Sequence, residues 1–212
     1  ARHHDEAFGA NYELPNGSAY NETCAAIGNA MWNHRMFLLH GESKYIDVLE
    51  RILYNGFLAG ISIDGDEFFY PNPLASDSTY KFNKGSTARQ GWFACSCCPV
   101  NIVRFIPAIA GYVYAKRDDD IYVNLFMPGE GTIDLGGDPV RLTQQTRYPW
   151  DGKVQITVDP ERSRQFTLKI RIPGWTRGEC VPSDLYHYQD RAAGKVSLQV
   201  NGHEVPLTLQ QG

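Results

Sequence analysis

The chain of 212 residues lacks three features that would assign it to common classes of protein. It has no run of about 18 apolar residues, which a membrane-spanning helix would need. Its 20 lysines and arginines are outnumbered by 24 aspartates and glutamates, and the net charge of −4 provides no basic surface for nucleic acid. Its five cysteines are an odd number, which argues against a secreted disulfide framework. The sequence therefore predicts neither a membrane nor a nucleic-acid partner.

The remaining composition is that of folded globular protein. Hydrophobic residues make up 42% of the chain and charged residues 21%. The chain does not begin with methionine, and its last residues follow directly on a strand-like run. We therefore expect both ends to be cuts in a longer protein. The oligomeric state stays open, a homodimer included.

Three of the five cysteines lie within four positions, at Cys95, Cys97 and Cys98. Two adjacent thiols are poorly placed to bridge each other, but both can face a metal ion if the backbone turns there. A carboxylate and a thiol stand two positions apart far upstream, at Glu22 and Cys24. One carboxylate and three thiolates are the four ligands that a tetrahedral zinc site requires. We therefore predict that these two residues, with Cys97 and Cys98, bind one zinc ion.

Two other roles for the cysteines stay open at this point. Free cysteines are among the most buried residues and often fill a core as small apolar groups. The cluster could also serve a thiol redox protein, which would form a reversible disulfide without zinc. Clustered thiols favour a reducing compartment, so we expect the cytoplasm, with the periplasm as the alternative because zinc can shield thiols there.

Apolar residues recur at helical spacing in the first half of the chain, which predicts helices over about 19–40, 44–58 and 99–116. The first helix would carry Glu22 and Cys24 in its first turn. Residues two apart on a helix do not share a face. We therefore expect both to reach one ion only if that ion lies near the helix end.

Between the second and third helices the sequence predicts a hairpin followed by a long loop. Asp64-Gly65 stands between two short extended runs within 61–70, a common hairpin signal. Prolines, serines and threonines make 71–92 loop-like. Loops of this length in a compact domain are usually functional.

Strand patterns dominate after residue 118. Short alternating runs are separated by glycine, proline and aspartate turns, which favours an antiparallel β-sandwich. The runs are 121–126, 132–135, 140–143, 154–158, 166–172 and 196–200. We predict a helical part over 1–118 and an incomplete β-sandwich domain over 119–212.

Six short motifs, taken together, resemble the glycoside hydrolase family 127 β-L-arabinofuranosidases. They are Glu6-Ala-Phe-Gly9, Tyr12-Glu-Leu-Pro-Asn16, Glu22-Thr-Cys-Ala-Ala-Ile-Gly28, Tyr54-Asn-Gly56, Phe69-Tyr-Pro-Asn-Pro73 and Cys95-Ser-Cys-Cys-Pro99. The resemblance implies an (α/α)6-barrel catalytic domain followed by β-sandwich domains. Three helices cannot close such a barrel, so the chain would hold its C-terminal part and the start of a sandwich.

The resemblance also implies a mechanism. In this family a zinc-bound cysteine is the nucleophile and a glutamate is the general acid/base. Carried over by motif, Cys97 is the nucleophile, Glu6 is the acid/base and Tyr70 contacts the sugar, while the implied zinc ligands are the four residues named above. The implied reaction is retaining hydrolysis that releases β-L-arabinofuranose or a related furanosyl sugar from an oligosaccharide or polysaccharide of plant origin. The alternative is a structural-zinc protein that binds carbohydrate without hydrolysing it.

Overall fold

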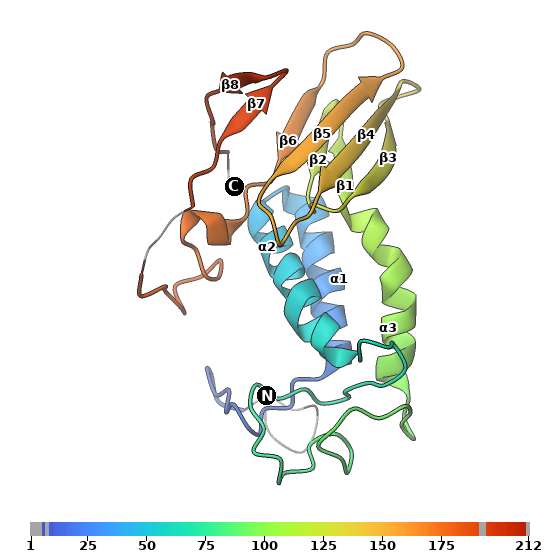
Figure 1. The fold of residues 1–212 in the computed structure, drawn as a ribbon, viewed down its shortest axis with the longest axis vertical. Coiled ribbons are helices and arrows are strands. Elements are labelled where there is room, and N and C mark those ends of the chain that lie inside the picture. The colour runs from blue at the N-terminus through green and yellow to red at the C-terminus, as the bar shows by residue number, and fades with distance from the viewer. Residues whose placement is uncertain (1–5, 7–8, 191–193, 211–212) are drawn as a thin grey trace. The chain divides into compact units, whose positions relative to one another are not determined.

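A computed structural model describes residues 6, 9–190 and 194–210 (Figure 1). The chain divides into two compact units. The first unit consists of residues 1–35 and 48–108, and the second of residues 36–47 and 109–212. None of the helices in the described ranges is both long and apolar enough to cross a bilayer.

Three α-helices form near the predicted positions, with shifted ends. They are α1 (Thr23–His40), α2 (Ser43–Ile52) and α3 (Cys97–Ala108). Gly41 ends α1 with a positive φ of 74°, a conformation that glycine adopts without steric cost. A π-helical turn (Leu53–Phe57) and a 3₁₀ turn (Leu58–Gly60) occupy the predicted end of the second helix, and a further 3₁₀ turn (Ile109–Tyr112) follows α3.

The first unit has its own apolar core between the helices. Ile27 of α1 and Ile102 of α3 are fully buried, and the rings of Phe57 and Phe105 meet edge to face with centroids 5.1 Å apart. The irregular segments 9–22 and 61–96 lie at one end of these helices, where α1 and α3 begin (Figure 1). The N-terminal ends of both helices therefore face the loops rather than the middle of the core.

One fully buried side chain, that of Asn83, organises the loops of the first unit. Its Oδ1 accepts a hydrogen bond from the backbone N–H of Tyr70 at 2.8 Å, and its Nδ2 donates to the carbonyls of Phe68 at 3.1 Å and Ala88 at 2.8 Å. Isolated bridges pair Phe68 with Ile61 and with Gln90. The predicted turn at 64–65 is present, and the long loop is held by specific bonds although it forms no regular element.

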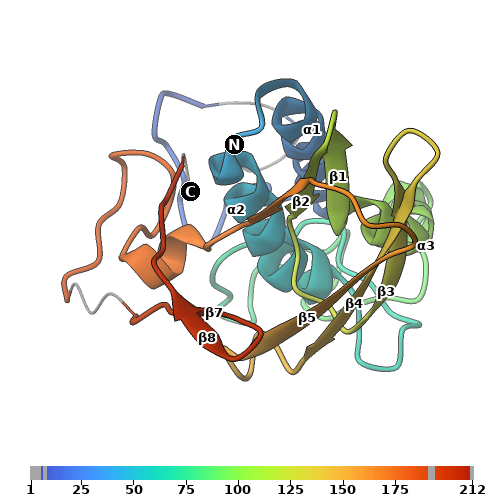
Figure 2. The same cartoon turned by 90° about the horizontal axis from the view of Figure 1, so that it is seen from above.

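The described residues of the second unit form eight short strands. They are β1 (Tyr114–Arg117), β2 (Asp120–Val123), β3 (Gly129–Asp134), β4 (Pro139–Thr146), β5 (Val154–Pro160), β6 (Thr167–Ile170), β7 (Leu198–Val200) and β8 (His203–Val205). They form sheets in the orders β1-β2-β6, β3-β4-β5 and β7-β8. Figure 2 shows β3, β4 and β5 side by side as one sheet.

The strand pairing confirms a mixed chain of helices followed by antiparallel strands, with two differences. Strand β2 pairs in parallel with β6, from Asp120 opposite Thr167 to Val123 opposite Ile170. Strand β1 lies where the third helix was expected to end, because the left-handed backbone at Asp118 (φ 53°) turns the chain back so that β1 pairs with β2. Alternation of apolar residues shows which side chains are buried, but it carries no information about the direction of the partner strand.

The core of the second unit is built from side chains of both larger sheets. Its buried members are Ile121, Val123, Phe126, Ile133, Leu135, Val140 and Leu142. They alternate with half-buried residues along β2 and with half-buried or exposed residues along β4, as expected for sheets with one covered face.

Candidate functional site

The first half of the site is built where the chain enters α1. Residue Glu22 lies just before the helix and forms an isolated antiparallel bridge with Pro71. The N–H of Thr23 donates to the carbonyl of Tyr70 at 3.1 Å, and the Thr23 hydroxyl donates to the carbonyl of Phe69 at 2.8 Å. The expectation that Glu22 lies in the first helical turn is therefore wrong. Because the backbone of Glu22 is paired with Pro71 and is not helical, the angle between successive helical side chains does not apply to it. Its side chain can therefore point to the same place as that of Cys24.

The second half of the site is the first turn of α3. Cys97 and Cys98 are its first two residues rather than its preceding residues, and Pro99 is the third. Proline is tolerated there because the N–H groups of a first turn have no partner within the helix. Cys98 is fully buried, whereas Cys97 is half-buried.

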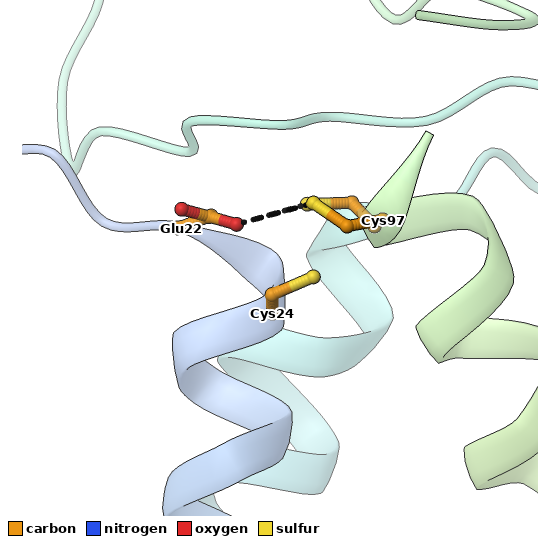
Figure 3. A group of neighbouring side chains, drawn as sticks. Glu22, Cys24 and Cys97 are labelled. Atoms are coloured by element: carbon orange, nitrogen blue, oxygen red, sulfur yellow. Dashed lines mark hydrogen bonds between the residues drawn. The ribbon is translucent and has the colours of Figure 1, made fainter. Parts of the chain in front are cut away.

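The structure brings together Glu22, Cys24, Cys97 and Cys98, whose ligand atoms all lie within 4.8 Å of one another. Figure 3 shows Glu22 and Cys24 at the start of α1 facing Cys97 at the start of α3. Glu22 Oε1 lies 3.6 Å from the sulfur of Cys97 and 3.6 Å from that of Cys98, and the two sulfurs are 3.9 Å apart.

These separations fit one tetrahedral metal ion. With metal–sulfur bonds of about 2.3 Å and metal–oxygen bonds of about 2.1 Å, a tetrahedron has sulfur–sulfur edges of about 3.8 Å and sulfur–oxygen edges of about 3.6 Å. The three distances above agree with these edges to within about 0.1 Å. Glu22, Cys97 and Cys98 therefore already have the separations of three ligands of one tetrahedral ion, and the Cys24 sulfur lies within 4.8 Å of each of them.

The electrostatics of the four groups also fit a cation. Burial, together with the nearby Cys24, raises the pKa of Glu22 to about 7. A hydrogen bond from Cys98 lowers the pKa of Cys24 to about 6, and the same bond is the main cause that raises the pKa of Cys98. Burial raises the pKa of Cys97 to about 11. Without a cation, ionisation of Cys24 therefore disfavours ionisation of the other three groups, because like charges repel. A divalent ion would relieve this repulsion between the four anionic groups.

Tyr70 lies against the sulfur of Cys97. Its hydroxyl oxygen is 3.1 Å from Cys97 Sγ and 3.9 Å from Cys95 Sγ, and its ring is buried. A thiol can donate to the phenol oxygen, but a thiolate can only accept, so the ionised Cys97 would receive the Tyr70 proton in the hydrogen bond. Burial and this bond raise the pKa of Tyr70, which keeps the phenol protonated.

The other predicted residues fall into two groups. Glu6 is exposed and lies close enough to Glu22 to raise the pKa of that carboxyl, by repulsion and by a hydrogen bond. Cys95 is exposed and lies outside the group of four, and Cys180 belongs to the second unit.

Two residues near the site were not predicted from the sequence. The ammonium of Lys84 lies 4.3 Å from the centre of the Tyr70 ring and donates a hydrogen bond to the Tyr20 hydroxyl at 3.1 Å. Asn83-Lys84-Gly85 is a turn signal that could have indicated a tight turn. Nothing in the sequence indicates that this turn meets Tyr70.

The helices, the antiparallel strands and the thiolate–carboxylate cluster define a mixed α/β chain with a candidate metal centre. Two family models match it: the GH127 β-L-arabinofuranosidase catalytic domain over residues 1–111 and the GH127 middle domain over residues 120–212. The chain therefore belongs to glycoside hydrolase family 127.

Individual relatives agree with this assignment. A non-reducing end β-L-arabinofuranosidase from Bifidobacterium longum is 36% identical over 185 residues, covering 83% of this chain and 28% of the relative. A solved GH127 β-arabinofuranosidase is 49% identical, with a TM-score of 0.91. The match covers 100% of this chain and 32% of the chain of that enzyme. A GH127 β-L-arabinofuranosidase from Geobacillus stearothermophilus T6 is 38% identical with a TM-score of 0.81, over 94% and 30% of the two chains. The chain thus spans about a third of the length of these relatives.

Proposed function

We propose that this chain carries the zinc site of a retaining glycoside hydrolase that releases β-L-arabinofuranose or a related furanosyl sugar from plant glycans. Membership of family 127 and the β-L-arabinofuranosidase and β-arabinofuranosidase relatives named above support the reaction class. The observation on which the mechanism depends is the group of four donors whose ligand atoms all lie within 4.8 Å of one another, with the sulfurs of Cys24 and Cys97 half-buried and that of Cys98 buried.

In this proposal Glu22, Cys24, Cys97 and Cys98 hold the metal, and zinc is the ion that a donor set rich in thiolates favours. When bound, zinc would keep the coordinating sulfurs deprotonated at neutral pH. The Cys97 thiol by itself has a raised pKa of about 11 and would be almost entirely protonated there.

Among these sulfurs, Cys97 is the best candidate for the nucleophile. Cys98 is fully buried and cannot meet a substrate. Cys24 and Cys97 are both half-buried, and the match of the Cys95–Pro99 motif to the family favours Cys97. Its sulfur also has the Tyr70 hydroxyl 3.1 Å away, a donor that would orient the sulfur and stabilise it when it leaves in the second step. The position of the Tyr70 hydroxyl beside the Cys97 sulfur supports its proposed contact to a sugar bound at that sulfur.

Glu6 would act as the general acid and then as the general base. In the first step the Cys97 sulfur attacks the anomeric carbon, the bond to the leaving oxygen breaks, and the Glu6 proton passes to that oxygen. In the second step water attacks the same carbon, gives its proton to Glu6 and releases the thiolate. The closeness of Glu6 to Glu22 supports this assignment, because it brings the carboxyl next to the cysteine cluster.

The exposed surface of the first unit supports the wider architecture that we propose, namely the C-terminal part of an (α/α)6 barrel over 1–118 and an incomplete β-sandwich over 119–212. Val100, Val103 and Ile106 lie on one face of α3 and are 54%, 66% and 51% exposed. An apolar face of this kind on a soluble helix is usually covered. Further helices of the barrel, supplied by the rest of a full-length protein, would cover it.

The test is hydrolysis of p-nitrophenyl β-L-arabinofuranoside by the full-length protein, with and without a chelator. We expect turnover that is lost on metal removal and restored by zinc. Cys97→Ser and Glu6→Gln should abolish turnover while circular dichroism shows a retained fold. Full turnover in Cys97→Ser would refute the nucleophile. Sugar affinity without turnover in the parent would favour the carbohydrate-binding alternative.

A further inference from the structure

We propose that Lys84 is a positioning residue that holds the Tyr70 hydroxyl against Cys97. This inference rests on the proposed function, because it assigns Lys84 a part in the reaction at the same sulfur. It starts from the surroundings of the Tyr70 ring, which is only 4% exposed and is enclosed by two other aromatic rings. Tyr20 meets it at 6.5 Å and Phe93 at 5.5 Å between centroids.

The ammonium of Lys84, an exposed residue, lies over this ring. It lies 4.3 Å from the centre of the Tyr70 ring and 5.3 Å from that of Tyr20, and it donates a hydrogen bond to the Tyr20 hydroxyl at 3.1 Å. A cation over the face of a phenol is attracted by the ring's quadrupole. It also draws electron density from the ring, which makes the hydroxyl a stronger hydrogen-bond donor. When Cys97 is a thiolate it can only accept, and its sulfur, 3.1 Å from the hydroxyl oxygen, would then receive that bond.

The backbone around Lys84 is built to hold the ammonium in this place. Lys84 has a positive φ of 51°, a strained conformation for a residue with a side chain. The preceding residue, Asn83, is fully buried and binds the backbone N–H of Tyr70 at 2.8 Å. Two consecutive residues thus fix Tyr70, one through its backbone and the other through its ring. The strain at Lys84 is explained if the ammonium is required over that ring.

Charge gives Lys84 a second reason to be there. The hydrogen bond to Tyr20 is the main cause that raises the pKa of Lys84. The carboxyls of Glu22 and Glu6 raise this pKa further. Lys84 therefore offsets part of the negative charge that three thiolates and a carboxylate bring to the cluster.

The test is a double-mutant cycle in the full-length, metal-loaded protein with Lys84→Met and Tyr70→Phe. Methionine keeps the length of the side chain and adds no backbone strain. We expect Lys84→Met to lower kcat about 2- to 5-fold with a smaller change in KM, since Lys84 is exposed and an exposed cation–π contact is of that size. In the Tyr70→Phe background the same substitution should have little further effect. Lys84→Arg should retain most of kcat, because the guanidinium is also a cation that sits over aromatic rings.

A second readout does not need turnover. The rate of Cys97 alkylation by iodoacetamide, followed by peptide mass spectrometry, reports the environment of that sulfur directly. Lys84→Met and Tyr70→Phe should shift this rate in the same direction, and the double variant should shift it no further. If the parent protein had no turnover, the proposed function would fail while the alkylation cycle would still decide the role of Lys84.

Lys81→Met is the matched control. Lys81 is an exposed lysine three residues earlier in the same loop, and the described part of the chain shows no hydrogen bond or ion pair from its side chain. Its substitution should change neither readout. Additive effects of the two substitutions, loss of bound metal in Lys84→Met, or a Lys84→Arg variant as impaired as Lys84→Met would each overturn the proposal.

Discussion

The ion pair between Arg171 and Asp47 gives the sharpest prediction about the stability of the second unit. Arg171 Nη1 lies 2.6 Å from Asp47 Oδ1, and the two side chains are only 2% and 13% exposed. Arg171 Nε also donates to the carbonyl of Asn124 at 2.6 Å, and the N–H of Gly174 donates to Asp47 Oδ1 at 3.2 Å. Asp47→Ala would remove this carboxylate from the buried guanidinium.

The loss in free energy of unfolding on Asp47→Ala is set by the burial of the two side chains rather than by the distance between their charged atoms. Removing one partner of a buried pair typically costs about 3–5 kcal/mol. Hydrogen exchange measured by mass spectrometry on peptides that cover β2 and β6 would report this loss. Exchange through opening of the unit should become roughly 150- to 5,000-fold faster, since about 1.4 kcal/mol corresponds to a factor of ten.

A second ion pair provides a control with the same geometry. Arg141 Nη2 and Asp159 Oδ2 are also 2.6 Å apart, but these side chains are 54% and 56% exposed. Asp159→Ala should leave exchange nearly unchanged, because water already solvates both charges. An acceleration below tenfold for Asp47→Ala, or one equal to that of Asp159→Ala, would refute the reasoning. Replacement of both buried partners by Asp47→Leu with Arg171→Met should restore most of the protection, because no unpaired charge stays buried.

Two further predictions concern the metal and the core. Cys98→Ser should lower the bound zinc, measured by inductively coupled plasma mass spectrometry, to well below one ion per chain. Cys95→Ser, outside the group of four, should leave the bound zinc unchanged. Equal zinc contents in the two variants would contradict the ligand set. Leu142→Ala, at a fully buried position of β4, should destabilise the second unit by about 2–5 kcal/mol in urea unfolding. Val158→Ala, paired with Leu142 on β5 and 37% exposed, should cost clearly less, and a larger cost there would contradict the placement of Leu142 in the centre of the core.

The residues of the candidate metal site could be named from the sequence, because the argument needed only ligand chemistry. Carboxylate and thiolate groups are rare enough in such clusters that Glu22, Cys24, Cys97 and Cys98 stand out by type. Their local structure could not be obtained in the same way. Helical spacing extended the first helix back through Glu22, whereas in the structure a bridge to Pro71 keeps that residue out of α1. That bridge is a contact across 49 positions, and periodicity reports only neighbours a few residues away.

By itself the sequence determined the order of helices and strands, the buried alternation of β2 and β4, and the chemical types at the site, since each depends on residue identity and short-range spacing. Only the tertiary structure decided that β6 runs parallel to β2, that the Tyr70 hydroxyl meets Cys97 and that Lys84 lies over the Tyr70 ring. These contacts join segments that are far apart in the chain. Their geometry depends on how loops close and cores pack, and no local pattern encodes that outcome.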